Sequence, residues 1–334
     1  MKRVLLLSTG GTIAARQGDL GLAPQVATAS LLSYVPELSG RFEIEAKDIL
    51  SMDSSNIQPE EWQTIARAVY DQLDRFDGIV ITHGTDTMAY TASMLSYMLQ
   101  NLKKPVVLTG SQVPIESILT DAKSNLCTAF EAVEAGIPGV SIAFDHKIIN
   151  GCRAVKVRTM GFEAFESVNA PCLAEVFANG LQRGGGVIIP RDEQKPTLLK
   201  DNLCTDVFLL KLLPGTNPAV LKMLMDMRYR GIVLETFGAG GMHFLRRNLL
   251  PELQQLTDRG VSIVACSQCL YETSDFSLYE VGTRLLACGV IAGRDMTTEA
   301  AVTKLMWALG QTEDPEEVRR IFDTNFTGEI SLEQ

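Results

Sequence analysis

The sequence has few histidines, and they form no familiar catalytic motif. Its 334 residues include only His83, His146 and His243. None lies in an H-E-x-x-H pair, which would hold a catalytic zinc ion on a helix, and no G-x-S-x-G elbow presents a serine nucleophile. The sequence therefore lacks the usual signatures of a zinc protease and of a serine hydrolase that uses histidine as its base.

Long apolar runs and an excess of positive charge are also missing. No run approaches the ~18 residues that span a bilayer, and the apolar start Val4–Leu7 is broken by polar residues and glycines too early for a signal peptide. The formal net charge is −10 and the sequence pI is near 5.0, so phosphate backbones and anionic lipid surfaces are repelled. We expect a cytoplasmic protein that binds neither nucleic acid nor membrane.

The cysteines support neither a disulfide framework nor a metal site. Seven cysteines are an odd number, which fits a reducing compartment. Cys266 and Cys269 form a C-x-x-C motif, but no second such motif and no nearby histidine completes a zinc site. We therefore expect no bound metal and interpret the pair as buried residues at a strand end.

What the sequence does have is an alternation of short apolar runs and helical stretches. Hydrophobic residues make up 46% of the chain, and runs such as VLLL, GIVIT and PVVLTG recur along it. Trp62, Ile65 and Val69 follow Pro59 at helical spacing, which predicts a helix between two of these runs. The alternation predicts an α/β fold with mainly parallel sheets that helices cover on both faces.

The chain length predicts two such domains. The pattern lapses over residues 179–200, which contain a glycine triplet, two prolines and mixed charges, as is typical of a connecting segment. We predict a catalytic domain over residues 1–180, a linker over 181–205 and a smaller domain over 206–334, both domains being doubly wound.

Glycines and hydroxyl-bearing residues gather where the predicted strands end. These segments are STGGT (8–12), MDSS (52–55), THGTDT (82–87) and TGSQ (109–112). Taken singly, such serines and threonines are usually N-caps, and a glycine pair that matches no nucleotide-binding pattern is usually a structural turn. Because ligands bind at the carboxyl ends of parallel strands, several such segments together indicate a site. His83 adjoins one of them and has no obvious orienting partner.

Four motifs then resemble those of a known enzyme family. They are TGGTI (9–13), HGTDTMAYTASML (83–95), KPVVLTGSQVP (104–114) and GCRAVKVRTMGFEAFES (151–167). In this order they are similar to the L-asparaginases of the bacterial type I, cytoplasmic group, and the similarity continues through GVIAGRDMTTEAAVTKL. It covers nearly the whole chain, and four motifs in the family's order are highly specific.

The resemblance implies hydrolysis of the side-chain amide of L-asparagine to L-aspartate and ammonia, without a metal or an organic cofactor. It implies that Thr12 is the nucleophile that forms an acyl-enzyme, and that Thr85, Asp86 and Lys156 form a second catalytic group. A threonine nucleophile without a histidine needs another base. A lysine can be that base only as a neutral amine, and burial favours this neutral form whereas a close carboxylate opposes it. We expect backbone N–H groups around Gly11 and residues 84–86 to stabilise the oxyanion.

The resemblance also implies a substrate pocket and self-association. Asp53, Ser54 and Ser55 match the segment that holds the α-carboxylate of the substrate, and Asp86 faces the α-ammonium group. The family forms homodimers or homotetramers in which the smaller domain completes a neighbour's site, and Tyr279 is a candidate for that contribution, with Glu280 beside it.

Two departures from the family pattern concern the early loop and regulation. The family often has a tyrosine near the nucleophile where this chain has Leu22. The segment 16–23 shows no strong period, so we predict a mobile lid over the substrate. Some type I members also bind a regulatory asparagine, but Glu235 and Gly241 do not resemble such a pocket.

Two other functions remain open at this stage. One is that of the amidotransferase component with the same fold, which deamidates glutamine for transfer RNA charging. That component usually has an additional N-terminal domain and a basic surface, whereas this acidic sequence opens on its first strand. The other is a catalytically silent amino-acid-binding protein, which would bind asparagine without turnover.

Overall fold

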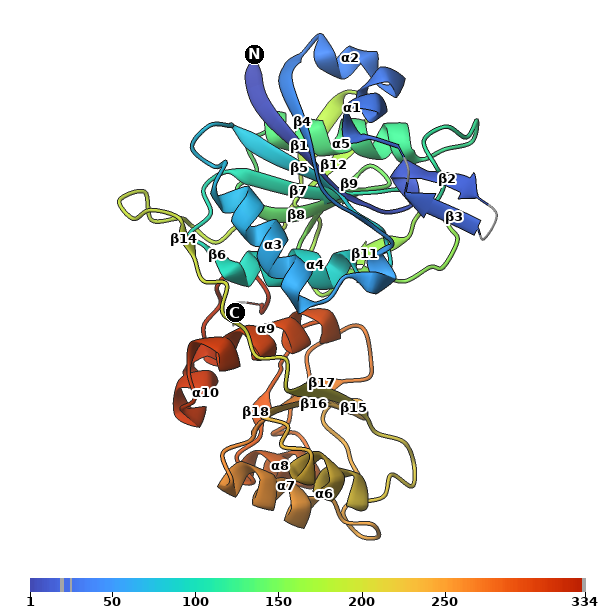
Figure 1. Ribbon diagram of the computed structural model, residues 1–334. Helices are drawn as coiled ribbons and strands as arrows, with labels where there is room; N and C mark the ends of the chain where they lie inside the picture. The colour runs from blue at the N-terminus through green and yellow to red at the C-terminus, as the bar shows by residue number, and fades with distance from the viewer. Residues whose placement is uncertain (19–20, 25, 332–334) are drawn as a thin grey trace. The chain divides into compact units, whose positions relative to one another are not determined.

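The computed structural model describes residues 1–18, 21–24 and 26–331. The chain divides into two compact units, Met1–Asp201 and Asn202–Gln334, coloured blue to yellow and yellow to red in Figure 1. Each unit has a mainly parallel sheet with helices on both faces, which confirms the predicted fold class. The division falls inside the segment 181–205, for which the sequence predicts a linker.

The first unit is built on an eight-stranded sheet within the described residues. In spatial order its strands are β13 (Gly180–Arg183), β12 (Ala174–Phe177), β9 (Lys147–Asn150), β8 (Gly139–Phe144), β7 (Pro105–Thr109), β5 (Gly78–Thr82), β1 (Lys2–Gly10) and β4 (Phe42–Met52). The pairings from β8 through β4 are parallel, and those of β9, β12 and β13 are antiparallel. The chain leaves β1 to form β4 on one side and β5 on the other, so β1 is the point at which the winding changes direction.

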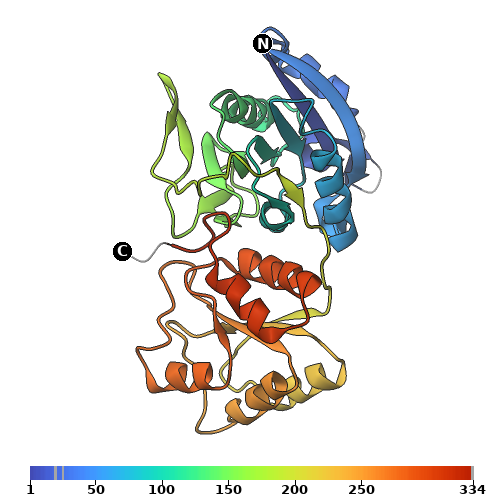
Figure 2. The same ribbon diagram turned by 90° about the vertical axis from the view of Figure 1, so that its left-hand side faces the viewer.

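Helices cover this sheet on both faces, as the apolar runs predict. The helices are α1 (Thr28–Leu31), α2 (Pro36–Ser39), α3 (Pro59–Tyr70), α4 (Met88–Met98) and α5 (Ala122–Glu134). Val4 and Leu6 of β1 pack with Phe130 of α5 in one hydrophobic core, while Leu5 and Leu7 point to the opposite face and are also buried. In Figures 1 and 2, α5 lies on one side of the sheet and α4 on the other.

Among the described residues, three two-stranded sheets complete the first unit. They are β2 (Ala15–Gly18) with β3 (Gly21–Pro24), β10 (Ala154–Lys156) with β11 (Phe165–Ser167), and β6 (Leu99–Gln100) with β14 (Leu198–Leu199). Where the segment 16–23 is described, its residues belong to two paired antiparallel strands, and its predicted role as a mobile lid stays a prediction. The Leu22 side chain, on which the prediction of a lid depends, lies outside the described residues.

The second unit is a four-stranded parallel sheet within the described residues. Its strands are β15 (Val207–Lys211), β16 (Gly231–Thr236), β17 (Ser262–Ser267) and β18 (Ile291–Ala292), and its helices are α6 (Ala219–Asp226), α7 (Leu250–Asp258), α8 (Glu280–Ala287), α9 (Thr298–Gln311) and α10 (Pro315–Asp323). Leu224, Leu253 and Leu285, one from each of α6, α7 and α8, form a core against one face of the sheet, and α9 covers the other face (Figure 1).

Cysteine placement agrees only in part with the expectation from sequence. All seven cysteines are free. Cys266 is buried in β17, as predicted, but Cys269 is exposed because the strand ends before it. No helix of the described residues has both the length and the apolar character that a bilayer span needs.

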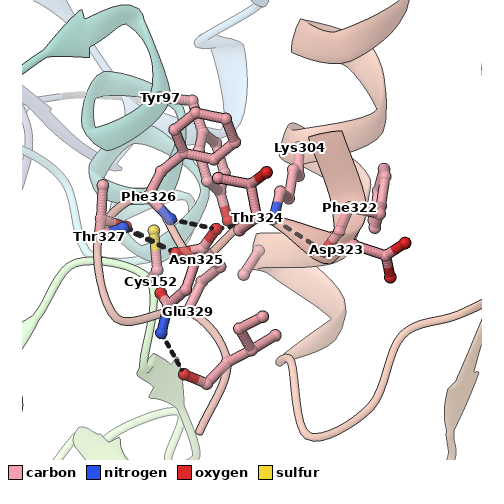
Figure 3. Close-up of polar contacts among 12 residues, drawn as sticks. Tyr97, Cys152, Lys304, Phe322, Asp323, Thr324, Asn325, Phe326, Thr327 and Glu329 are labelled. Carbon is pink, nitrogen blue, oxygen red and sulfur yellow. Dashed lines mark hydrogen bonds and ion pairs between the residues drawn. The ribbon is translucent and has the colours of Figure 1, made fainter. Parts of the chain in front are cut away.

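A buried ion pair fastens the C-terminal segment onto α9. The side chains of Lys304 and Glu329 are both fully buried, with Nζ 2.7 Å from Oε1. Lys304 also donates to the carbonyl of Thr324 at 2.8 Å, while the backbone N–H groups of Phe326 and Thr327 donate to the Glu329 carboxylate (Figure 3). Burial raises the pKa of Glu329, but the Lys304 charge and these hydrogen bonds outweigh it and hold that pKa below its ordinary value.

We expect Glu329→Gln to destabilise the protein by about 3–5 kcal/mol, because it leaves the Lys304 ammonium buried without its counter-charge. Calorimetric unfolding measures the loss. The matched control is Glu313→Gln, since Glu313 is 90% exposed and 3.6 Å from Arg230, and such pairs contribute little. The double variant Lys304→Met/Glu329→Leu should recover only part of the loss, because it removes the buried charge but leaves the N–H groups of Phe326 and Thr327 without their acceptor. Equal stabilities of Glu329→Gln and Glu313→Gln would contradict this account.

Candidate active site

The carboxyl ends of β4, β1 and β5 meet at one edge of the large sheet. Gly10 of β1 lies beside Met52 of β4, and Ser8 lies beside Thr82 of β5. The Thr9 hydroxyl donates to the Thr82 carbonyl at 3.0 Å. Three of the segments that the sequence indicates, 8–12, 52–55 and 82–87, are therefore neighbours in space.

The paired glycines allow these backbones to touch. Gly10 and Gly11 have φ values of 105° and 78°, a region that favours glycine. A Cβ on Gly10 would lie 2.5 Å from the Met52 backbone nitrogen, and one on Gly11 would lie 2.4 Å from the backbone nitrogen of Gly84. The glycines are thus required because two backbone segments of the protein approach each other closely, rather than because a ligand approaches them. This contact packs the start of the Thr12 turn against the turn after β5.

Thr12 opens a single 3₁₀ turn, Thr12–Ala14, directly after this contact. Its side chain is partly buried, while the next two residues are fully covered. The carbonyl of Ile13 accepts a hydrogen bond from the N–H of Ile115 at 3.3 Å. The turn is therefore held on both sides of the hydroxyl that the sequence predicts to be the nucleophile.

Lys156 is brought to the turn after β5 by the short strand β10. Its Nζ lies 2.8 Å from Thr85 Oγ1 and 2.6 Å from Asp86 Oδ1. The Lys156 side chain is 16% exposed and that of Asp86 is 63% exposed. Lys156 is 71 positions from Thr85 and 70 from Asp86 in sequence, and the fold brings these three predicted residues together. Lys156 contacts one carboxylate oxygen of the exposed Asp86 side chain, which leaves the other oxygen available to a ligand.

The segment predicted to bind a carboxylate is a short turn ahead of α3. Asp53 caps this turn and accepts hydrogen bonds from the backbone and side chain of Ser55. The Ser55 hydroxyl and N–H, together with the charge of Lys156, hold the pKa of Asp53 below its ordinary value. Ser54 Oγ accepts from the N–H of Asp86 at 3.2 Å, which ties this turn to the second catalytic group.

Gln112 is a member of the site that the sequence analysis did not single out. Its Nε2 donates to the carbonyls of Thr159 and Gly161 at 3.3 and 3.0 Å, which turns its Oε1 toward Thr85 Oγ1, 3.4 Å away. The one sequence feature that could have identified Gln112 as a site residue is its position in TGSQ at the end of β7. Single glutamines at strand ends are common, and only the fold places this one beside Thr85.

The backbone N–H groups at the site are not all available to a ligand. The N–H of Gly11 donates to the carbonyl of Met52 at 3.0 Å, and that of Asp86 donates to Ser54 Oγ. Both were expected to face an oxyanion, and both are already used. Among the expected donors in the described part of the chain, the N–H groups of Thr12, Gly84 and Thr85 have no acceptor, so they remain free to bind a developing negative charge.

His83 is buried beneath the turn, and its orienting partner is present after all. Its Nδ1 lies 2.7 Å from the carbonyl oxygen of Gly84, and its Nε2 lies 3.0 Å from Thr91 Oγ1 of α4. Complete burial lowers the pKa of His83 to about 4, although the Gly84 carbonyl opposes the shift. The ring is therefore neutral at physiological pH.

The neutral state of His83 predicts a loss of stability in mild acid. The ring takes up a proton near pH 6.5 in the unfolded chain but only near pH 4 in the folded one. The contribution of neutral His83 to the free energy of unfolding is fully present above pH 6.5. It falls as the pH drops toward 4 and levels off below that, and the total loss is up to ~3 kcal/mol. Urea unfolding at several pH values measures the slope. His83→Asn should show a shallower slope over this range, and an unchanged slope would contradict the prediction.

Comparison with known proteins decides the family. Residues 3–184 match the family description "Asparaginase, N-terminal", and residues 206–322 match "Glutaminase/Asparaginase C-terminal domain". The chain belongs to the asparaginase family. The predicted resemblance is confirmed at this level, while the bacterial type I group is not singled out, because archaeal proteins are among the similar relatives.

Proteins similar to this asparaginase-family chain include both L-asparaginases and an amidotransferase subunit. An L-asparaginase from Thermococcus kodakarensis is 44% identical over 98% of this chain and 99% of that protein. L-asparaginase 1 from Escherichia coli K12 is 34% identical over 99% of this chain and 98% of that protein. A glutamyl-tRNA(Gln) amidotransferase subunit from Pyrococcus horikoshii is 35% identical over 98% of this chain and 76% of that protein.

Solved structures in the family have the same architecture. The thermostable L-asparaginase from Thermococcus kodakarensis has a TM-score of 0.91 at 43% identity, covering 99% of this chain and all of that one. L-asparaginase I from Vibrio cholerae has a TM-score of 0.87 at 34% identity, covering 99% of both chains. A probable cytoplasmic L-asparaginase from Campylobacter jejuni has a TM-score of 0.83 at 28% identity, covering 97% of this chain and all of that one. The family fold is thus preserved over essentially the full described length.

Proposed function

We propose that this protein is an L-asparaginase that releases ammonia through a threonine acyl-enzyme. The observation that carries the proposal is the group formed by Thr85, Asp86 and Lys156, which lies at the same sheet edge as the Thr12 turn. Family membership and the names of the relatives support the substrate. The residue roles rest on this geometry and on the family resemblance.

The chemistry requires a nucleophile, a base and a place for negative charge. In the proposed reaction Thr12 Oγ1 attacks the side-chain amide carbon of L-asparagine and loses its proton to the Thr85–Lys156 pair. The C–N bond then breaks, the nitrogen leaves as ammonia after gaining a proton, and water hydrolyses the ester to L-aspartate. The N–H groups of Thr12 and Thr85 would hold the oxyanion of both tetrahedral states.

The substrate's α-groups suit the remaining polar residues. Asp86 keeps one carboxylate oxygen for an ammonium group, since Lys156 contacts the other. In the turn Asp53–Ser55 the exposed hydroxyl is that of Ser55, which is turned toward Asp53 and must rotate to contact an α-carboxylate, whereas Ser54 is buried and its Oγ accepts from the N–H of Asp86. Among the described residues no cluster of three or more potential ligands is placed to hold a metal ion, and the proposed steps use none.

Ammonia release from L-Asn, D-Asn, L-Gln and an asparaginyl peptide, measured side by side, tests the function. We expect L-asparagine to have the highest kcat/KM. No release from any substrate, with asparagine still bound in calorimetry, would identify a catalytically silent amino-acid-binding protein instead.

The second candidate is the amidotransferase function, which the 35% identity to the Pyrococcus horikoshii amidotransferase protein favours. That function requires glutamine as the ammonia donor, and the difference between the two substrates is one methylene, worth only ~1–3 kcal/mol in a pocket. The net charge of −10 is unfavourable for a transfer RNA partner. A preference for L-Gln over L-Asn in the same assay would favour this second function.

We also propose that the chain works as a homodimer or homotetramer in the cytoplasm, as the family resemblance implies. Seven free cysteines suit a reducing compartment. Tyr279 is 59% exposed at the start of α8 and is available to a second copy. Sedimentation of the active enzyme should show an oligomer, and a fully active monomer would overturn this part of the proposal.

A further inference from the structure

A buried chain of hydrogen bonds runs from α3 to the turn that contains Thr85. Trp62 Nε1 lies 3.0 Å from Thr91 Oγ1, which lies 3.0 Å from His83 Nε2, and His83 Nδ1 lies 2.7 Å from the Gly84 carbonyl oxygen. The exposed fractions are 7% for Trp62 and 0% for both Thr91 and His83. None of these side chains has a role in the proposed reaction.

The two ends of this chain fix the direction of every bond in it. An indole N–H can only donate, so Thr91 Oγ1 accepts from Trp62. A carbonyl oxygen can only accept, so His83 Nδ1 must carry a proton and donate it to Gly84. A neutral ring then has a bare Nε2, which accepts the single hydroxyl proton of Thr91. The arrangement selects one tautomer, and it leaves no donor or acceptor in the chain unmatched.

The bond to Gly84 acts on the peptide group that joins Gly84 to Thr85. A trans peptide is planar, and its C=O and N–H point in opposite directions; none of the described peptide bonds is cis. Holding the Gly84 carbonyl toward His83 therefore directs the Thr85 N–H the other way. That N–H is one of the free donors at the site.

We propose that His83 is a positioning residue that directs the Thr85 N–H at the oxyanion by holding the Gly84 carbonyl in its Nδ1–H tautomer. The inference rests on the proposed function for its catalytic consequence, but the tautomer itself does not. Gly11 and Ser54 pack closely against Gly84, but among the described residues His83 supplies the hydrogen bond to the Gly84 carbonyl, and Ser54 holds the N–H of Asp86 rather than that of Thr85.

Two substitutions of His83 separate positioning from packing. The amide nitrogen of asparagine reaches approximately the place of Nδ1, so His83→Asn can keep the donor to Gly84 and lose the Thr91 contact. The amide of glutamine reaches approximately the place of Nε2, so His83→Gln can keep the Thr91 contact and lose the donor. Both variants remove a buried ring, and the melting temperature of each reports that shared cost.

We expect His83→Gln to lower kcat roughly tenfold to a hundredfold with a small change in KM, because a misdirected oxyanion donor acts in the transition state. His83→Asn should stay within about threefold of the wild type, since it keeps the donor. Equal losses of kcat in the two variants would overturn the positioning role and leave His83 as a packing residue.

A measurement without turnover tests the tautomer directly. The chain has three histidines, so His146→Gln/His243→Gln leaves His83 as the only imidazole for nitrogen NMR at neutral pH. The expected spectrum is a neutral ring protonated at Nδ1. Thr91→Val should weaken this preference and Thr91→Ser should restore it. A ring protonated at Nε2, or a charged ring, would overturn the inference. If the wild type releases no ammonia from asparagine, the proposed function fails while this spectrum still decides the tautomer.

Discussion

Thr12→Ala should lose about three or more powers of ten in kcat on L-asparagine while the protein keeps its fold. The substitution removes the hydroxyl of the proposed nucleophile, and residues that act as a unit in covalent catalysis typically cost this much when removed. The turn itself is held by the Gly11–Gly84 contact and by the Ile13–Ile115 hydrogen bond, so the melting temperature should change little. Steady-state ammonia release and thermal unfolding are the two measurements.

Thr12→Ser is the matched control, since it keeps an alcohol at the same position and should retain measurable turnover. A mass increase on trapping with substrate should appear in the wild type and in Thr12→Ser but not in Thr12→Ala. The acyl-enzyme assignment would be falsified if Thr12→Ala kept more than a tenth of the wild-type kcat. In that case another hydroxyl at this edge, with Thr85 the nearest to Lys156, would have to be the nucleophile.

The sequence predicted the layers of the fold because the relevant signals are local. Apolar runs such as Gly78–Thr82 are buried along their whole length in a parallel sheet, and Pro59 starts a helix with Trp62, Ile65 and Val69 on its buried face. Both patterns follow from short-range periodicity. The fold class was therefore accessible without any knowledge of which strands pair.

What the sequence could not supply was the pairing across long separations. β1 lies between β4 and β5, and this register sets Gly10 beside Met52 and brings the Thr12 turn to the Gly84 turn. The N–H of Gly11 was expected to face the oxyanion, but pairing with β4 uses it on the Met52 carbonyl.

The roles of His83 and Gln112 could not be predicted because each depends on a side-chain orientation that the sequence does not show. The partners of His83 are the carbonyl of the next residue, Gly84, and the Thr91 hydroxyl, and the partner of Gln112 is Thr85. Hydrogen-bond partners of single polar residues leave no periodic signal in a sequence. The resemblance to a family points to the catalytic candidates, and the fold determines which side chains surround them.

Lys156→Met should abolish turnover, and Lys156→Arg should fail as well. Lys156 is the one basic side chain that contacts both Thr85 and Asp86 in the described part of the chain. As a base it must accept a proton through Thr85 and return it to the leaving nitrogen, which a neutral amine can do and a guanidinium cannot. Methionine removes the exchangeable proton altogether, whereas arginine keeps the positive charge beside Asp86. The pair of variants therefore separates proton transfer from charge.

The measurements are kcat and KM on L-asparagine, with Lys195→Met as the control. Lys195 is also paired with a carboxylate, 3.2 Å from Asp192, but its side chain is 76% exposed, so its loss should leave kcat unchanged. Binding of L-aspartate to each Lys156 variant shows whether the pocket survives. If Lys156→Arg kept substantial activity, proton transfer by Lys156 would be ruled out. Lys156 would then act through its charge alone, by holding Asp86 in place and lowering the energy of the negative charge that develops near Thr85.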